Sequence, residues 1–163
     1  MVGKDIQYTP LSRLKKPQRD NFLAIIKQVE KKTFPANEAF AFDEELAKRN
    51  TTLIVAIKDF DVDVGEELVG YLVYVRVKRV ALLHKVCVVE HCRREGIARA
   101  MLISLREDLE RQGCTIIQLW VDAERKPAKL LYSQLGFREA QRVDDYYGPG
   151  RTGLKMILEL ENR

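Results

Sequence analysis

The sequence has little histidine, little cysteine and no long apolar run. Its 163 residues include two histidines and three cysteines, Cys87, Cys92 and Cys114. An odd and sparse set of cysteines argues against a disulfide scaffold and is typical of a reducing compartment. No apolar run approaches the roughly 18 residues of a membrane span, and residues 1–5 lead into no signal segment. We therefore expect free thiols in a soluble protein of the cytoplasm or nucleus, with no membrane partner.

The excess of positive charge is small. Lys and Arg number 28 against 24 acidic residues, which gives a formal net charge of +4, and 46% of the residues are apolar. Acids interrupt most basic stretches, as in residues 106–111, so the composition disfavours a nucleic-acid binder, which would concentrate its cations. The length suits about one domain, and we expect a single domain over residues 1–163.

Hydrophobic periodicity predicts alternating strands and helices. Strands are predicted at residues 5–8, 52–58, 68–78, 80–89, 115–121, 137–142 and 154–160. Helices are predicted at residues 17–32, 43–48, 97–113 and 127–136, the third from an apolar stripe of Ile97, Met101, Leu105 and Leu109. A polar loop with Tyr146 and Tyr147 is expected between the last two strands. These elements predict one alternating α/β unit.

Residues 92–99 form the segment that most strongly indicates a ligand-binding site, because they join a predicted strand to the start of a helix. The first amides of a helix lack intrahelical acceptors and lie at the positive end of its dipole, so main chain alone can bind phosphate there. Gly96 lets a ligand approach closely, and Ala98 keeps the next turn small. Cationic donors are supplied by Arg93, Arg94 and Arg99. A tight turn with solvated arginines is the alternative interpretation. The segment matches neither the Walker loop nor the dinucleotide fingerprint.

The pattern Arg93-x-x-Gly96-x-Ala98 resembles the acyl-CoA loop of the GCN5-related N-acetyltransferase (GNAT) superfamily, which is Gln or Arg, two residues, Gly, one residue, then Gly or Ala. Residues 86–89 resemble the strand that contacts pantetheine in this family, and residues 128–137 resemble its second motif. The element order is similar over about residues 5–160. The resemblance implies the GNAT fold, an α/β (α+β) fold with a mixed central β-sheet of six to seven strands flanked by about four helices. It also implies an acyltransferase that uses acetyl-CoA and is most similar to the N-terminal (N-alpha) acetyltransferases.

The resemblance also implies roles for single residues. The implied cofactor-binding set is Val88, Val89, Arg93, Arg94, Glu95, Gly96, Ile97, Ala98 and Arg99. In that set the amides of residues 94–99 would hold the CoA pyrophosphate, while Val88 and Val89 would pair along the pantetheine arm. Tyr132 would lie near the thioester sulfur and protonate or hydrogen-bond the leaving thiolate, the alternative being a core tyrosine. Arg125 stands where the family often has Asn, a departure that affects one polar contact with the cofactor.

An obvious general base is missing from the two central strands. Leu82 and Trp120 occupy the places where relatives often carry Glu, His or Tyr. His84 shares strand parity with Leu82 and is the first candidate, acting through water, with Asp122 second; a satisfied core histidine is the alternative. At pH 7 an α-amine of pKa about 7.7 to 8.0 costs about 1 to 1.4 kcal/mol to deprotonate, against about 4.6 for lysine. An α-amine can therefore manage with a weak base.

Two short segments resemble the acceptor-binding parts of N-terminal acetyltransferases, namely a Phe-Pro loop and a tyrosine-bearing hairpin. The candidate substrate-binding residues are Phe34, Pro35, Glu38, Tyr146 and Tyr147. A helix-breaking turn and an aromatic strand end are the alternative interpretations. We expect transfer to a primary amine, with a protein or peptide N-terminal α-amine favoured. A polyamine or arylalkylamine acceptor and a non-catalytic CoA-binding regulatory module remain alternatives.

A zinc interpretation of His84, Cys87, His91 and Cys92 is disfavoured. His84 and Cys87 are three residues apart in a predicted strand and so point to opposite faces. Neither a CxxC nor an HxxxH pair supplies adjacent ligands. We expect no metal.

Overall fold

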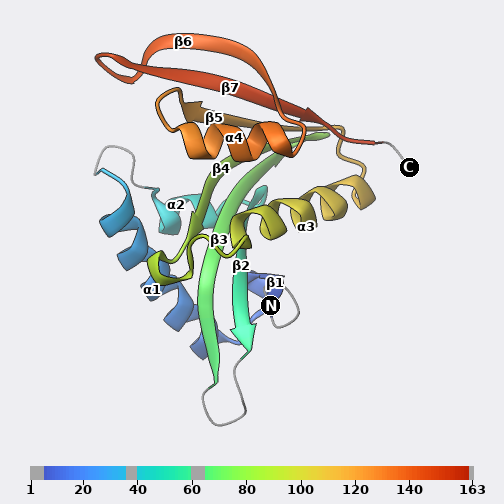
Figure 1. Cartoon of the computed structure of the whole chain (residues 1–163). Coiled ribbons are helices and arrows are strands. Elements are labelled where there is room, and N and C mark those ends of the chain that lie inside the picture. Colours follow the sequence, from blue (N-terminus) through green and yellow to red (C-terminus); the bar gives the residue numbers. More distant parts are fainter. Residues whose placement is uncertain (1–5, 36–39, 60–64, 162–163) are drawn as a thin grey trace. The chain divides into compact units, whose positions relative to one another are not determined.

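The computed structural model describes residues 6–35, 40–59 and 65–161, and in this part of the chain it shows an α/β fold (Figure 1). The strands are β1 (Ile6–Pro10), β2 (Thr51–Asp59), β3 (Glu66–Val77), β4 (Val80–Val88), β5 (Ile116–Asp122), β6 (Arg138–Gly148) and β7 (Arg151–Glu159). The α-helices are α1 (Lys16–Thr33), α2 (Phe42–Leu46), α3 (Ile97–Arg111) and α4 (Lys126–Gln134), and the short 3-10 helices are η1 (Leu11–Arg13) and η3 (Glu90–Cys92). These elements confirm the predicted fold class.

The strands form a mixed seven-stranded sheet in the order β1-β2-β3-β4-β5-β7-β6. β4 and β5 pair in parallel, through Val80–Leu83 and Ile116–Leu119. The pairs β1–β2, β5–β7 and β6–β7 are antiparallel. Two neighbours in sequence order, β5 and β6, are thus separated in the sheet by β7, which is inserted between them.

Packing divides the chain into two compact units, one of Met1–Val73 with Lys85–Met101 and one of Tyr74–His84 with Leu102–Arg163. In the first unit, Phe22 and Ile26 lie four residues apart on α1, so helical geometry places both on the buried face. They join a core made of Leu11, Phe42, Leu53, Val55, Ile57, Leu68, Tyr71, Val73 and Cys87. Burial of this apolar surface at roughly 25 cal/mol per Å² is the main force that holds α1 to the strands.

In the second unit the buried residues of β5 alternate along the strand. Ile117, Leu119 and Val121 are all nearly inaccessible to solvent, as expected when one strand face is covered. Helix α3 contributes Leu105 and Leu109, the last two residues of the apolar stripe predicted from sequence, and both are buried. No helix within residues 6–35, 40–59 and 65–161 is both long and apolar enough to cross a membrane.

The predicted polar loop around Tyr146 and Tyr147 is wrong, because both residues lie in β6. Polar side chains do not exclude a strand here, since β6 is the last strand in the sheet and most of its residues are exposed. An irregular register between Val143 and Gly148 absorbs the extra residues, and the Gly150 amide donates to Asp145 Oδ1 over 2.7 Å. The hairpin of β6 and β7 is consequently long and its turn is short (Figure 1).

Candidate active site

The predicted anion loop lies between η3 and α3 and is exposed from Arg93 to Gly96. Gly96 has a φ of 77°, and a Cβ built on it would meet no atom within 4 Å, so the space above this residue is open. The first helical bond of α3 runs from the Ala100 amide to the Gly96 carbonyl over 3.0 Å. The amides of Ile97, Ala98 and Arg99 therefore precede the helical ladder and suit an anion.

Buried side chains fix the loop at both of its ends. Cys92 is 6% exposed before the loop, and Ile97 is 2% exposed after it. Arg93 Nε donates to the Val88 carbonyl over 3.0 Å, which ties the loop to the end of β4. Arg93 thus has a structural contact, whereas Arg94 and Arg99 are exposed cations beside the open amides. Arg94 also adopts a φ of 66°, so the turn uses a left-handed residue other than glycine.

The end of β4 offers main-chain groups on one side. The Val89 amide donates to the Val69 carbonyl over 2.9 Å, which is on the side of β3. Because successive residues of a strand direct their amides to opposite sides, the Val88 amide faces away from β3. In the described part of the chain, residue pairs between β4 and β5 end at Leu83. Val88 is therefore better placed than Val89 to pair with an extended ligand.

Tyr132 lies on α4 and is half-buried. Its ring meets Phe137 edge-on, with the centroids 5.6 Å apart. Burial raises the pKa of the Tyr132 hydroxyl, and the positive charge of Arg125 opposes this effect. Among the described residues the hydroxyl makes no hydrogen bond. The phenol is therefore protonated at neutral pH and its proton is available to a ligand.

The two candidate bases differ in their surroundings. His84 is exposed, so the alternative interpretation of a buried core histidine is wrong. Asp122 is 7% exposed; its Oδ1 accepts the Glu124 amide over 2.9 Å, and its Oδ2 accepts Arg151 Nη2 over 3.0 Å. The hydrogen bond from the Glu124 amide and the positive charge of the Arg151 guanidinium hold the pKa of Asp122 below its ordinary value. Asp122 is thus a weak base that anchors the chain before α4.

The tyrosines of β6 belong to an aromatic cluster in the second unit. Trp120 and Tyr146 stack with centroids 4.2 Å apart and planes inclined by 11°. Tyr147 meets Tyr146 edge-on at 4.9 Å, and the Arg151 guanidinium lies 5.3 Å from the centre of the Tyr147 ring. The sequence indicated the tyrosine pair but not its stacking partner. Aromatic rings that carry polar groups can pack against apolar parts of a bound peptide and also hydrogen-bond to its backbone.

Replacing Gly153 by alanine should displace Tyr146 from Trp120. A Cβ at Gly153 would lie 2.6 to 2.8 Å from three atoms of Tyr146, including its own Cβ, so the ring cannot simply swing aside. We expect a cost of about 1–3 kcal/mol in unfolding free energy, typical of overpacking. Trp120 is the single tryptophan, so its fluorescence reports the change directly.

The double variant Gly153→Ala with Tyr146→Ala is the control for this prediction. Once the tyrosine ring is absent, the added methyl group has space, and the double variant should be about as stable as Tyr146→Ala alone. Wild-type emission and stability in the single variant Gly153→Ala would show that the close packing is not maintained in solution.

The Phe-Pro segment lies next to a buried charged cluster that the sequence patterns did not indicate. Glu30 is 2% exposed, and its Oε1 lies 3.1 Å from Lys85 Nζ. The same oxygen accepts the Phe40 amide over 3.2 Å, while Glu30 Oε2 accepts the Tyr71 hydroxyl. Lys85 Nζ in turn lies 3.7 Å from the centre of the Phe34 ring. Glu30 thus contacts the chain after the Phe-Pro segment through the Phe40 amide, and Lys85, its ion-pair partner, contacts Phe34 at the start of the segment. The predicted substrate-binding residue Glu38 lies outside the described residues.

One sequence signal could have revealed Glu30. Phe22, Ile26 and Glu30 recur at intervals of four on α1, and all three are buried. A carboxylate at the third position of such a stripe must have partners inside the protein, because an unpaired buried charge is costly. The partner Lys85 is on β4 and cannot be identified from spacing along the helix.

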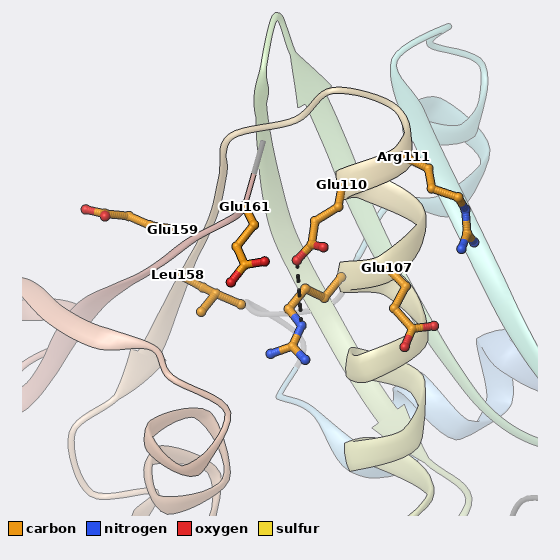
Figure 2. A pocket seen from close by; sticks show the side chains of 7 residues that line it. Glu107, Glu110, Arg111, Leu158, Glu159 and Glu161 are labelled. Atoms are coloured by element: carbon orange, nitrogen blue, oxygen red, sulfur yellow. Dashed lines mark ion pairs between the residues drawn. The ribbon is translucent and has the colours of Figure 1, made fainter. Parts of the chain in front are cut away.

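A cavity with a volume of about 850 Å³ lies in the second unit, between the end of α3 and the end of β7 (Figure 2). Its walls are Arg106, Glu107, Glu110, Arg111, Leu158, Glu159 and Glu161. Four of these side chains are carboxylates, and Arg106 already lies 3.9 Å from one of them, Glu110. This cavity would repel the phosphates of an anionic cofactor, so its size does not make it the candidate active site.

Comparison with known proteins agrees with the loop and the fold. The sequence profile of the Acetyltransferase (GNAT) family matches residues 19–137. The [Ribosomal protein bS18]-alanine N-acetyltransferase of Escherichia coli (strain K12) is 37% identical over 67 residues, which span 41% of this chain and 45% of that enzyme. The match thus covers less than half of the relative's length.

Two solved structures share the fold over nearly the whole chain. The ribosomal-protein-S18-alanine N-acetyltransferase from Escherichia coli has a TM-score of 0.75 at 20% identity, with 96% of this chain and 94% of that chain covered. Arabidopsis thaliana NAA60, solved in complex with acetyl-CoA, has a TM-score of 0.76 at 20% identity, with 94% and 98% covered. Together with the family profile, which spans most of the sequence, these findings establish that the chain belongs to the acetyltransferase (GNAT) family.

Proposed function

We propose that the chain is an acetyl-CoA-dependent N-acetyltransferase that transfers acetyl directly to a primary amine, namely a protein or peptide N-terminal α-amine. The observation that carries this proposal is the start of α3, where Gly96 leaves the first helical amides open to a diphosphate. In this role the amides of residues 94–99 hold the CoA pyrophosphate, with Arg94 and Arg99 as added cations. Val88 pairs with the pantetheine arm, which brings the thioester into a fixed orientation.

Tyr132 is the proposed proton donor to the departing thiolate. When the acceptor amine attacks the thioester carbonyl, the carbon–sulfur bond breaks and the sulfur takes the electron pair. A protonated phenol can hydrogen-bond that sulfur or transfer its proton to it. Two observations support this assignment: the pKa of Tyr132 is raised, and its hydroxyl makes no hydrogen bond to any of the residues that the structure describes.

The acceptor assignment rests on the weak basicity of the site. Asp122 is engaged by Arg151 and by a backbone amide, which leaves exposed His84 as the proposed base, acting through water. An α-amine is already partly neutral near pH 7, so a weak base suffices for it but not for a lysine. The aromatic cluster of Trp120, Tyr146 and Tyr147 supports peptide binding, as does the alanine N-acetyltransferase activity named for the Escherichia coli relative.

The test of this proposal is CoA release with matched acceptors. One peptide with a free N-terminus is compared with the same peptide carrying a blocked N-terminus and an internal lysine, and with spermidine and an arylalkylamine. We expect the free N-terminus to be acetylated at least about tenfold faster near pH 7, as the difference in deprotonation cost allows. Equal or faster acetylation of the blocked peptide or of either small amine would overturn the acceptor assignment.

The anion loop is tested by cofactor binding alone. Gly96→Asp places a carboxylate beside the helix start and should weaken CoA binding by at least about tenfold. Gly96→Asn is the matched control, since its side chain has nearly the same shape as Asp and a similar tolerance of φ 77° without the charge. Equal CoA affinity for the two variants, measured by calorimetry, would refute the loop as the pyrophosphate site.

A further inference from the structure

A mixed group of metal-ligating side chains lies directly before the anion loop. It consists of Glu67 on β3 with His91 and Cys92 on η3, and their donor atoms all lie within 4.8 Å of one another. His91 Nε2 and Glu67 Oε1 are 2.6 Å apart. In the described part of the chain no other group of three or more potential ligands gathers in this way.

The types of donor in this group match a transition metal. A thiolate, an imidazole and a carboxylate are the three ligands that zinc commonly takes in proteins, with water completing a tetrahedral site. A surface ion pair would require only Glu67 and His91, whose side chains are 31% and 65% exposed. Cys92 adds a third donor from the buried side, where it is 6% exposed. With a thiolate and a carboxylate, a divalent ion would leave the group close to neutral.

Three charged side chains act electrostatically on the Cys92 thiol, and two of them are acidic. Glu67 and Glu95 both act electrostatically on its thiol as anions, and Lys58 acts on it as a cation. Two carboxylates against one ammonium favour the approach of a divalent cation.

The backbone fixes one ligand and leaves the other two adjustable. The Cys92 amide donates to the Val89 carbonyl over 2.8 Å, so the turn that carries His91 and Cys92 is set by main chain. Two ligands on one tetrahedral zinc ion lie about 3.3 Å apart, given bonds of about 2.0 to 2.1 Å. The contact between Glu67 and His91 must therefore lengthen when an ion binds, which these partly exposed side chains permit.

We propose that Glu67, His91 and Cys92 bind one divalent transition-metal ion, with zinc the best match to their donor types. On binding, the Cys92 thiol loses its proton to solvent and the ion takes a water molecule as its remaining ligand. This inference does not depend on the proposed acetyl transfer. The prediction of no metal considered His84, Cys87, His91 and Cys92, and Glu67 was absent from that set because it is distant in sequence.

The test uses cobalt(II) as a spectroscopic probe of the metal-free protein. We expect one equivalent to bind, with a near-ultraviolet thiolate-to-cobalt band and visible bands typical of four ligands, both abolished by added zinc. Cys92→Ser should remove the thiolate band, while His91→Asn and Glu67→Gln should each weaken binding by about tenfold or more.

Two control variants complete the test. Cys114→Ala removes another buried thiol and His84→Asn removes the other histidine, and neither should alter cobalt binding. His91 is exposed, so His91→Asn is expected to fold even if Cys92→Ser does not. Absence of the thiolate band in the wild type, or unchanged cobalt affinity in His91→Asn, would overturn the proposal.

Discussion

Replacing Glu30 by alanine should destabilise the protein by about 3–5 kcal/mol, the usual cost of removing one partner from a buried ion pair. Lys85, whose side chain is 13% exposed, would lose the carboxylate that neutralises it. The Tyr71 hydroxyl and the Phe40 amide would lose their acceptor as well. Because a whole domain is stable by only about 5–15 kcal/mol, chemical denaturation will detect this change readily.

Asp43→Asn is the matched control on an exposed pair. Asp43 on α2 accepts a hydrogen bond over 2.9 Å from Lys27, which lies on α1 as Glu30 does. The side chains of Asp43 and Lys27 are 78% and 41% exposed, so the expected loss is below about 1 kcal/mol. The double variant Glu30→Leu with Lys85→Met should recover much of the loss, since it leaves no buried ammonium without a counter-ion. If Glu30→Ala costs no more than Asp43→Asn, the buried pair does not exist in solution.

Tyr132→Phe should reduce kcat by about 100-fold or more while leaving CoA affinity unchanged, if Tyr132 supplies the proton to the leaving thiolate. The substitution removes only a hydroxyl that makes no hydrogen bond among the described residues, and the ring still packs against Phe137. Folding stability should therefore stay close to that of the wild type. Steady-state CoA release and calorimetric CoA binding separate the two effects.

Tyr8→Phe is the control for this experiment. Tyr8 lies on β1, and its buried hydroxyl also lacks a hydrogen-bond partner within residues 6–35, 40–59 and 65–161. Burial raises the pKa of Tyr8, as it does that of Tyr132. Loss of that hydroxyl should leave kcat unchanged. A Tyr132→Phe enzyme that keeps wild-type kcat would reduce Tyr132 to a packing residue, and the proton donor would have to be found elsewhere.

Local patterns were sufficient to predict most of the elements. The stripe of Ile97, Met101, Leu105 and Leu109 predicted α3, and all four residues are buried. The exposed loop before it was recognisable because glycine and arginine at a helix start have direct chemical consequences. The fold class followed from the alternation of such elements along the chain.

Contacts between distant segments could not be predicted in the same way. Glu30 meets Lys85 across 55 positions, and Glu67 meets His91 across 24, so neither pair leaves a periodic signal. The stacking of Tyr146 on Trp120 depends on an irregular register that propensity does not encode. The second half of β6 could not be predicted, because its charged residues Asp144 and Asp145 are typical of a polar loop and its position at the sheet margin leaves no local signal.

The position of β6 at the end of the sheet has a further consequence. In the part of the chain that the structure describes, no strand neighbours one side of its backbone, and such a margin can recruit a strand from another molecule. A strand laid along it would bring its own side chains against Arg138, Glu139, Arg142 and Asp144, all of them exposed. The exposed charged side chains of β6 thus protect the folded chain against edge-to-edge aggregation.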